Sequence, residues 1–262
     1  EGRVNSYVCR SFEMPSDRPY HVVSYEPLYD TSPPSSNVVH HVIMYSCDDD
    51  PRASDPHLCT SMNPNCYSVE AAVAVGSPPS VMPPSAGLPL KRHLYLEMHY
   101  ENLSGGSDVV RDGSGLRLTF TPVLRSQDYG YLFVGTSLFG IDPLAPGMNE
   151  RQTRTGFCSS DCLSRHLPEG GVKVHAVASH AHLLGRSLKT VHVRRSSAAD
   201  GTGTGTELPA LGDVPYYDFN HQSFLHAPGQ PVLLPGDELI TTCSYDASSR
   251  TSRTDFGFET RQ

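Results

Sequence analysis

The sequence lacks the two features that most directly identify membrane-spanning and nucleic-acid-binding proteins. No apolar stretch approaches the roughly 18 residues that a helix needs to cross a bilayer. No run or stripe of Lys and Arg is present, and the formal net charge is −8 with histidine neutral. These absences argue against a membrane-spanning helix and against nucleic acid as a partner. No signal peptide opens the chain, although Glu1 is not a start methionine, which is compatible with processing or truncation.

Long helical periodicities are missing as well. The chain contains 22 Gly and 22 Pro, and its short apolar runs alternate with clusters of Pro, Gly, Asn, Asp and Ser. This pattern is typical of an all-β sandwich or barrel. A length of 262 residues is enough for two ordinary domains, and the segment LRSQDYG at 124–130 is a plausible junction. We therefore expect an all-β chain with domains at 1–123 and 124–262.

None of the seven cysteines forms a CxxC pair, which argues against a zinc ribbon. Scattered cysteines in a β-rich chain indicate disulfides and an oxidising compartment, so we expect a secreted protein or one in the lumen of the secretory pathway. The triplet Asn102-Leu103-Ser104 is a glycosylation sequon and agrees with this. The segment 48–66 must be irregular, and its cysteines would pin it. Because seven is odd, at least one thiol is free or has its partner outside this chain.

The segment GVKVHAVASHAHLLG (171–185) predicts a buried strand that carries His180 and His182 two positions apart. Residues i and i+2 of a strand point to the same face, so the two imidazoles lie about 7 Å apart and can converge on one metal ion. We expect SLKTVHVRR (187–195) to pair with this strand after the LLGR turn. Segment 131–141 reads as a strand or hairpin, and segment 208–230 as irregular.

Two earlier strand-like segments also carry histidines. VVHHVIMYSC (38–47) contains the neighbours His40 and His41, which point to opposite faces of a regular strand. Both can reach one metal ion only if the strand has a bulge there, if the strand ends there, or if they use different ring nitrogens. The alternative is that one histidine lies in the core and the other on the surface. RHLYLEMHYEN (92–102) alternates between an apolar face and a face formed by His93, Tyr95, Glu97 and His99. A histidine at the polar end of a strand is usually exposed.

Taken in order, the HH pair, LYLEMHYEN and HAHLLGR resemble the copper type II, ascorbate-dependent monooxygenases, the group of dopamine β-hydroxylase and peptidylglycine α-hydroxylating monooxygenase. The resemblance extends over nearly all of the chain through YVCRSFEMP, the YEP segment at 25–27, TGFC…LPEG and LLPGDELITTCSYD. YEPLY and HLLGR are more similar to the dopamine β-hydroxylase branch.

The resemblance implies two tandem jelly-roll-like antiparallel β-sandwich domains, each with one copper, facing across a cleft. Position by position, it implies that His40, His41 and His99 bind an electron-storing copper, and that His180 and His182 bind the copper that meets oxygen and substrate. It further implies that ascorbate supplies the electrons and that an activated C–H bond of a small, phenylethylamine-like substrate is hydroxylated. Glu97 and Tyr7 are candidates for supporting the first site.

The resemblance also implies the disulfides Cys9–Cys59 and Cys47–Cys66, and leaves Cys158, Cys162 and Cys243 unpaired in this chain. In the family a methionine just after the TDFGF-like segment completes the second copper site, and the chain ends at Gln262 before that point. The methionines present lie elsewhere in the pattern: Met14, Met44, Met62, Met82, Met98 and Met148. We therefore expect a hydroxylase fragment that lacks its final strands.

Three other functions remain open. A secreted zinc hydrolase can also begin with HxH on a strand, but no carboxylate-plus-base motif follows it. A non-catalytic or incomplete copper-binding or adhesion sandwich is the second, and a peptidylglycine-type hydroxylase is the third. The run Asp48-Asp49-Asp50 reads as a solvated turn rather than a calcium site. Membrane attachment or oligomerisation of a longer protein leaves no signal in these residues.

Overall fold

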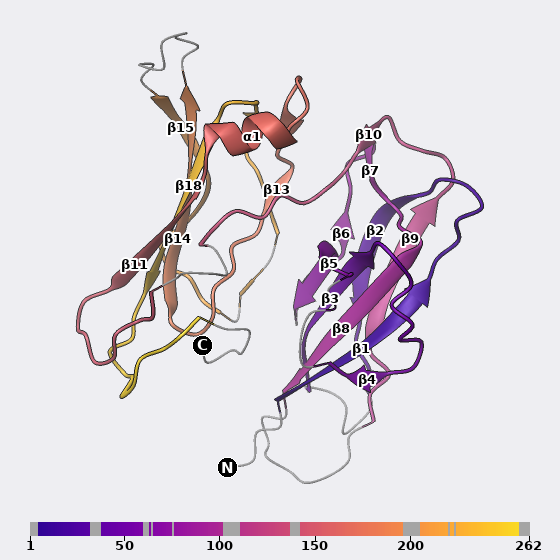
Figure 1. Ribbon diagram of the computed structural model, residues 1–262, viewed down its shortest axis with the longest axis horizontal. Coiled ribbons are helices and arrows are strands. Elements are labelled where there is room, and N and C mark those ends of the chain that lie inside the picture. The colour runs from indigo at the N-terminus through magenta and orange to yellow at the C-terminus, as the bar shows by residue number, and fades with distance from the viewer. Residues whose placement is uncertain are drawn as a thin grey trace. The chain divides into compact units, whose positions relative to one another are not determined.

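The computed structural model (Figure 1) describes the chain outside a few short segments. The described residues are 5–31, 38–59, 63, 65–74, 76–101, 111–136, 142–195, 205–219, 221–222 and 224–256. The chain divides into two compact units, Glu1–Tyr131 and Leu132–Gln262. Each unit is built from β-sheets in which all described strand pairs but one short parallel pair are antiparallel, which confirms the all-β class. Asn102 of the sequon lies outside the described residues. In the part described, no helix is long and apolar enough to cross a membrane.

Among its described residues, the first unit contains two five-stranded sheets. The first has the order β4-β1-β8-β3-β5. Its strands are β1 (Asn5–Glu13), β3 (Val39–Cys47), β4 (His57–Leu58), β5 (Ser68–Ala74) and β8 (His93–Glu101). The second has the order β10-β7-β2-β6, and β9 also pairs with β2. Its strands are β2 (His21–Leu28), β6 (Ser80–Val81), β7 (Ala86–Pro89), β9 (Gly115–Thr121) and β10 (Gln127–Asp128).

One core joins these two sheets into a sandwich. Val22 and Tyr25 of β2 are buried in the same cluster as Val42 of β3 and Met98 of β8. The predicted apolar face of β8 is confirmed, because Leu94, Leu96, Met98 and Tyr100 all pack in this cluster. Full burial of each large apolar side chain is worth about 1.5–3 kcal/mol relative to exposure. The opposite face of β8 is not a solvent face, however, since Tyr95 and His99 are also buried.

Residues 124–131 pack with the first unit, after the junction expected at 123. The Arg125 guanidinium donates hydrogen bonds to the carbonyl oxygens of Met82, Pro83 and Ala86. Strand β10 pairs with β7, and the Tyr131 hydroxyl is 2.9 Å from the Tyr25 hydroxyl. These contacts explain why the first unit runs to Tyr131.

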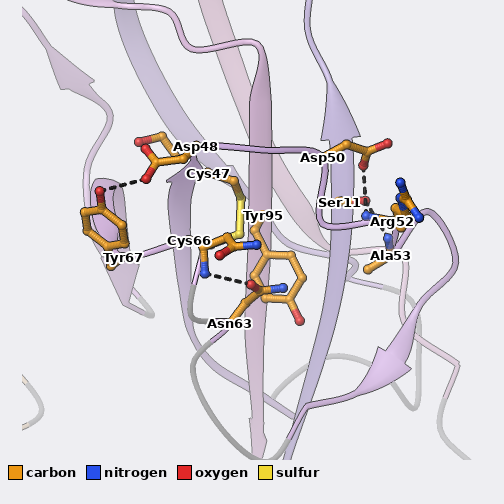
Figure 2. The surroundings of a disulfide bond; sticks show 12 residues. Ser11, Cys47, Asp48, Asp50, Arg52, Ala53, Asn63, Cys66, Tyr67 and Tyr95 are labelled. Carbon is orange, nitrogen blue, oxygen red and sulfur yellow. Dashed lines mark hydrogen bonds between the residues drawn. A yellow bond between two sulfur atoms is a disulfide. The ribbon is translucent and has the colours of Figure 1, made fainter.

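The cysteine-rich excursion after β3 is pinned as expected (Figure 2). Cys47 is bonded to Cys66, and Cys9 of β1 is bonded to Cys59. Figure 2 shows Asp48 and Asp50 turned toward different partners: Asp48 accepts from the Tyr67 hydroxyl, and Asp50 accepts from the backbone N–H of Arg52. The acidic run is therefore a hydrogen-bonded turn, in which these two carboxylates do not converge.

The second unit is organised around a four-stranded sheet with the order β11-β18-β14-β15. Its strands are β11 (Gln152–Cys158), β14 (Gly185–Arg195), β15 (Gly205–Val214) and β18 (Glu238–Tyr245). Two short ribbons accompany it: β12 (Val172–Lys173) with β17 (Val232–Leu233), and β13 (Ala176–Val177) with β16 (Leu225–His226). The short helix α1 (Ser160–His166) begins after Ser159, whose hydroxyl accepts from the Cys162 N–H, and buries Leu163.

Several strand predictions for this unit were wrong. Segment 171–185 is not one buried strand, because it breaks into β12 and β13, which pair with different partners, and 178–184 belongs to no strand. Strand β14 pairs with β15 and β18 rather than with that segment. Residues 208–214 are part of β15 and not irregular, and 131–136 form no strand. An apolar run favours extended backbone, but partners distant in sequence decide which part of it enters a sheet.

Candidate metal centre

The first candidate site lies on three neighbouring strands, β1, β8 and β3, of the first unit (Figure 1). Tyr7 of β1 lies opposite His99 of β8, and His99 lies opposite His41 of β3. Side chains directly opposite on adjacent strands share a face and are in contact distance. The register of the sheet therefore aligns one tyrosine and two histidines in a row across it.

A shift in the register of β3 against β8 brings His40 close to His41 and His99. Val39 pairs with Tyr100 and His41 pairs with His99, so His40 is an extra residue in β3. Such a bulge sets two successive residues against one partner and re-aims a side chain. The His40 and His41 ring centroids lie 5.0 and 4.7 Å from that of His99. The structure thus contains the bulge that two adjacent histidines need to reach one metal ion.

The three imidazoles present the same ring nitrogen to one another. Nδ1 of His41 lies 3.0 Å from Nδ1 of His40 and 3.4 Å from Nδ1 of His99. These three residues also form a group whose ligand atoms all lie within 4.8 Å of one another. Nitrogens that bind one first-row metal ion at about 2.0 Å are separated by about 3.3–3.5 Å. The donor set therefore fits a three-histidine metal site, and imidazole suits copper as well as zinc, iron and nickel.

Tyr7 packs against the histidine cluster, in which His99 is buried. The Tyr7 ring stacks on His99 with centroids 4.3 Å apart and planes 3° apart. His99 has 0% of its surface exposed, while His40 and His41 are partly exposed. A histidine at the polar end of a strand is usually exposed, but His99 is buried because the rings of Tyr7, His40 and His41 pack against it. A stacked ring fixes the orientation of His99 and leaves access from the side of the other two histidines.

Glu97 lies on the same strand as His99 and is tied to a different neighbour. Burial raises the pKa of Glu97, and a hydrogen bond from Tyr45 partly offsets that rise. Glu97 also lies close to Cys9 and Cys59. Because those two sulfurs form a disulfide, this second group offers no thiolate to a metal. The described contacts of Glu97 are thus with Tyr45 and with the Cys9–Cys59 disulfide, which lie beside the histidine cluster.

The second candidate site lies in the second unit, on the non-strand segment 178–184. The ring centroids of His180 and His182 are 5.2 Å apart, with planes at 87°. The two rings are thus neighbours, although a loop and not a buried strand carries them. His180 is exposed, His182 is partly exposed, and Ala181 between them is buried.

Two residues near this site were missed by sequence reasoning. The Tyr217 hydroxyl bonds the backbone of Ala181, and the Gln222 side chain bonds Nδ1 of His180. Both lie in the segment YYDFNHQ (216–222), which carries no periodicity and belongs to the region 208–230 that the sequence predicts to be irregular. Its density of Tyr, Asp, Asn and Gln was the one available signal of a hydrogen-bonding role.

The sulfur-containing residues do not complete the second site within the described chain. Met14, Met44, Met82 and Met98 belong to the core of the first unit, and Met148 is 44% exposed. Met62 lies outside the described residues. Cys158, Cys162 and Cys243 are free thiols. Burial and a hydrogen bond with Cys162 raise the pKa of Cys158 to about 11, so this thiol is protonated at neutral pH.

Comparison with known proteins gives two family matches that together cover most of the chain. The N-terminal domain of the copper type II ascorbate-dependent monooxygenases matches residues 2–107, and the C-terminal domain of the same family matches residues 128–262. Copper and ascorbate are therefore the cofactors of the family.

Three individual relatives each align with 98% of the chain. It is 33% identical over 273 residues to DBH-like monooxygenase protein 1 of Homo sapiens, covering 42% of that protein. It is 31% identical over 280 residues to MOXD1 homolog 1 of Drosophila melanogaster, covering 38% of it, and 31% identical over 275 residues to dopamine beta-hydroxylase of Bos taurus, covering 42%. The chain thus spans about two fifths of the length of these relatives. With both domains matched in order, this chain belongs to the copper type II ascorbate-dependent monooxygenase family.

Proposed function

We propose that this chain is the copper-binding core of a monooxygenase that hydroxylates an activated C–H bond of a small, phenylethylamine-like amine. The observation that carries the proposal is the convergence of three Nδ1 atoms, from His40 and His41 of β3 and His99 of β8, on one face of the sheet. A three-nitrogen set of this kind suits a redox copper, since imidazole is a good ligand for copper. The family match makes copper, rather than zinc, the metal that we assign to it.

In this proposal His40, His41 and His99 hold the electron-storing copper, and His180 and His182 supply two ligands to the second copper. Bound copper supplies one-electron redox chemistry and oxygen activation, which protein side chains alone cannot provide. One oxygen atom enters the C–H bond as a hydroxyl, and the other leaves as water, with two electrons from ascorbate and two protons. The partners of the protein are therefore oxygen, ascorbate and a small molecule.

In this proposal, residues of the two units have different roles. Tyr7 and the sheet around His99 exclude water from one side of the first site and keep its ring orientation constant, which favours repeated electron transfer without reorganisation. His180 is exposed, so the second site leaves room for a small molecule to approach its ligands. The proposed substrate class is supported by the names of relatives, which include a tyramine beta-hydroxylase of Caenorhabditis briggsae and a dopamine beta-hydroxylase.

We also propose that the protein is secreted or resides in the lumen of the secretory pathway. Two disulfides hold the first unit together, and disulfides persist in oxidising compartments. Glycosylation at Asn102 belongs to the same proposal, because the sequon would then meet the glycosylation machinery.

The proposal is tested by copper stoichiometry together with product analysis. We expect two Cu(II) ions per chain by elemental analysis and loss of both electron paramagnetic resonance signals on addition of ascorbate. Tyramine, oxygen and ascorbate should then give a product with one added oxygen atom, detected by mass spectrometry. His99→Ala should remove one copper and His180→Ala the other. His93→Ala, on the same strand as His99, is the matched control and should remove neither.

Other results would support the rival functions. Zinc bound in preference to copper would favour a zinc hydrolase. A single copper at the first site, with no ascorbate-dependent oxygen consumption, would favour a non-catalytic copper-binding sandwich. Hydroxylation of a glycine-extended peptide but not of tyramine would favour a peptidylglycine-type enzyme.

A further inference from the structure

Two side chains from the segment after β15 hold the loop that carries His180 and His182. We propose that Tyr217 and Gln222 position the ligands of the second copper site: Tyr217 clamps the backbone between the two histidines, and Gln222 sets which ring nitrogen of His180 is free for the metal. This inference rests on the proposed function, because it assumes that His180 and His182 are copper ligands.

The Tyr217 hydroxyl makes two hydrogen bonds to one residue. It donates to the carbonyl oxygen of Ala181 at 2.6 Å and accepts from the Ala181 N–H at 3.0 Å. Ala181 is buried and lies outside any strand, so no sheet partner satisfies these backbone groups. Burial raises the pKa of Tyr217 to about 12, which keeps the hydroxyl protonated and able to donate at neutral pH. One phenol thus replaces the sheet bonds that the loop lacks.

Close packing leaves the clamp little freedom. Ala181 and Tyr217 belong to one buried cluster with Leu188 and Cys243. A Cβ added at Gly185 would lie 2.7 Å from the Ala181 Cβ and 3.1 Å from Cδ1 of Tyr217. The loop therefore depends on a small residue at each of positions 181 and 185. Ala181 lies between His180 and His182 in the chain. Fixing its backbone therefore fixes the positions from which both imidazole side chains extend.

The orientation of the Gln222 amide follows from its second bond. Its Nε2 donates to the carbonyl oxygen of Phe219 at 2.7 Å, so Oε1 is the atom that faces His180. Oε1 lies 2.5 Å from Nδ1 of His180. An amide oxygen only accepts, so Nδ1 of His180 must carry the hydrogen. The lone pair is then on Nε2, and a ligating histidine typically donates its other N–H in this way.

The ring nitrogen that His180 leaves free for a metal is therefore the opposite one from that which faces inward at the first site. At the first site the Nδ1 atoms of three histidines face one another, whereas at the second site Nδ1 of His180 is already engaged by Gln222. The tautomer of His180 can therefore be observed in the protein without any metal.

Nitrogen-15 nuclear magnetic resonance of the metal-free chain tests it directly. We expect His180 to be in the Nδ1–H tautomer in the wild type and in Gln222→Glu, which retains an acceptor. In Gln222→Leu, which has similar size and no acceptor, we expect a shift toward the Nε2–H tautomer that free imidazole side chains prefer. Copper affinity at the second site should fall about 10- to 100-fold in Gln222→Leu and be largely retained in Gln222→Glu.

Tyr217→Phe tests the clamp, because it keeps the ring and removes only the hydroxyl. We expect the Ala181 amide to exchange with solvent at least about tenfold faster and the second copper to bind more weakly. Copper at His40, His41 and His99 in the same molecules is the internal control and should be unchanged in all three variants.

Two results would overturn the proposal: an Nε2–H tautomer of His180 in the wild type, or a Gln222→Leu protein with unchanged tautomer and unchanged copper affinity at the second site. Failure of the proposed function looks different. In that case the wild type binds no copper at His180 and His182, while Gln222→Leu still changes the tautomer.

Discussion

His40 and His41 show how much depends on a single residue. In a regular strand their side chains diverge, and one of them would be an ordinary core or surface histidine. The extra residue in β3 turns both rings toward His99. Burial of His99 beneath Tyr7 then leaves its imidazole one orientation, with Nδ1 toward His41.

Substitution of either neighbour should therefore affect the first site equally. Changes in outer-shell residues alone typically weaken metal binding about 10- to 100-fold, so loss of a ligand in His40→Ala or His41→Ala should weaken Cu(II) binding there by at least about 100-fold. Competitive titration with a copper chelator measures this. His57→Ala, an exposed histidine of β4 in the same sheet, should leave the affinity unchanged. A normal affinity in one of the two variants would mean that this histidine is not a ligand.

At the scale of elements, Asp237 ties the turn before β18 to strand β14. Its carboxylate accepts from Nε2 of His192 at 2.7 Å, from the Arg194 guanidinium at 2.9 Å and from the Leu234 N–H at 2.8 Å. Burial by itself would raise the pKa of Asp237, but the bonds from Arg194, Leu234 and His192 outweigh it and lower the pKa to about 2. The ionised form therefore stabilises the second unit.

The pH dependence follows from the direction of that shift. A carboxyl with a lowered pKa stabilises the fold above its unfolded value of about 4, and this stabilisation is lost as the pH falls toward 2. We expect Asp237→Asn to lower the free energy of unfolding by about 2 kcal/mol at pH 7, measured by urea denaturation. The difference from wild type should shrink between pH 4 and pH 2.

Asp213→Asn is the matched control, since Asp213 forms an exposed ion pair with Lys189 on the same sheet. Such surface pairs are worth about 0–1 kcal/mol. A difference between Asp237→Asn and wild type that stays constant from pH 7 to pH 2 would contradict the stabilising role of the ionised carboxylate.

At the scale of the whole molecule, the cysteines are distributed unevenly. Both disulfides, Cys9–Cys59 and Cys47–Cys66, lie in the first unit, while the three free thiols lie in the second. Cys9 is two positions from Tyr7 on β1, so the Cys9–Cys59 bond anchors the strand that covers His99.

Reduction should therefore destabilise one unit selectively. A disulfide contributes typically about 2–4 kcal/mol, so a reductant should lower the melting temperature of the first unit by about 10 °C or more and leave that of the second unchanged. Differential scanning calorimetry with and without reductant measures both transitions. Cys9→Ser combined with Cys59→Ser should lower the first transition without reductant, whereas Cys162→Ser should not. A shift of both transitions on reduction would contradict the assignment.

Much of the first unit could be predicted because its signals are local. Strand β8 alternates strictly, and its apolar face is the one that enters the core. The second unit was harder, because segment 171–185 has the composition of a buried strand but finds only two short ribbons as partners. Residue composition alone could not assign roles to Tyr217 and Gln222, since these roles exist only once a segment about 40 residues away folds against His180.

The sequence by itself determined the β class and the family and indicated five histidines as candidate metal ligands, because residue types, their periodicity and their order along the chain carry that information. Only the tertiary structure decided that a bulge brings His40 beside His41, that His99 is buried under Tyr7, and that a loop rather than a strand carries His180 and His182. The physical reason is register: a shift of one residue in pairing turns a side chain to the other face of a sheet. Contacts between distant strands, which no local pattern records, set that register.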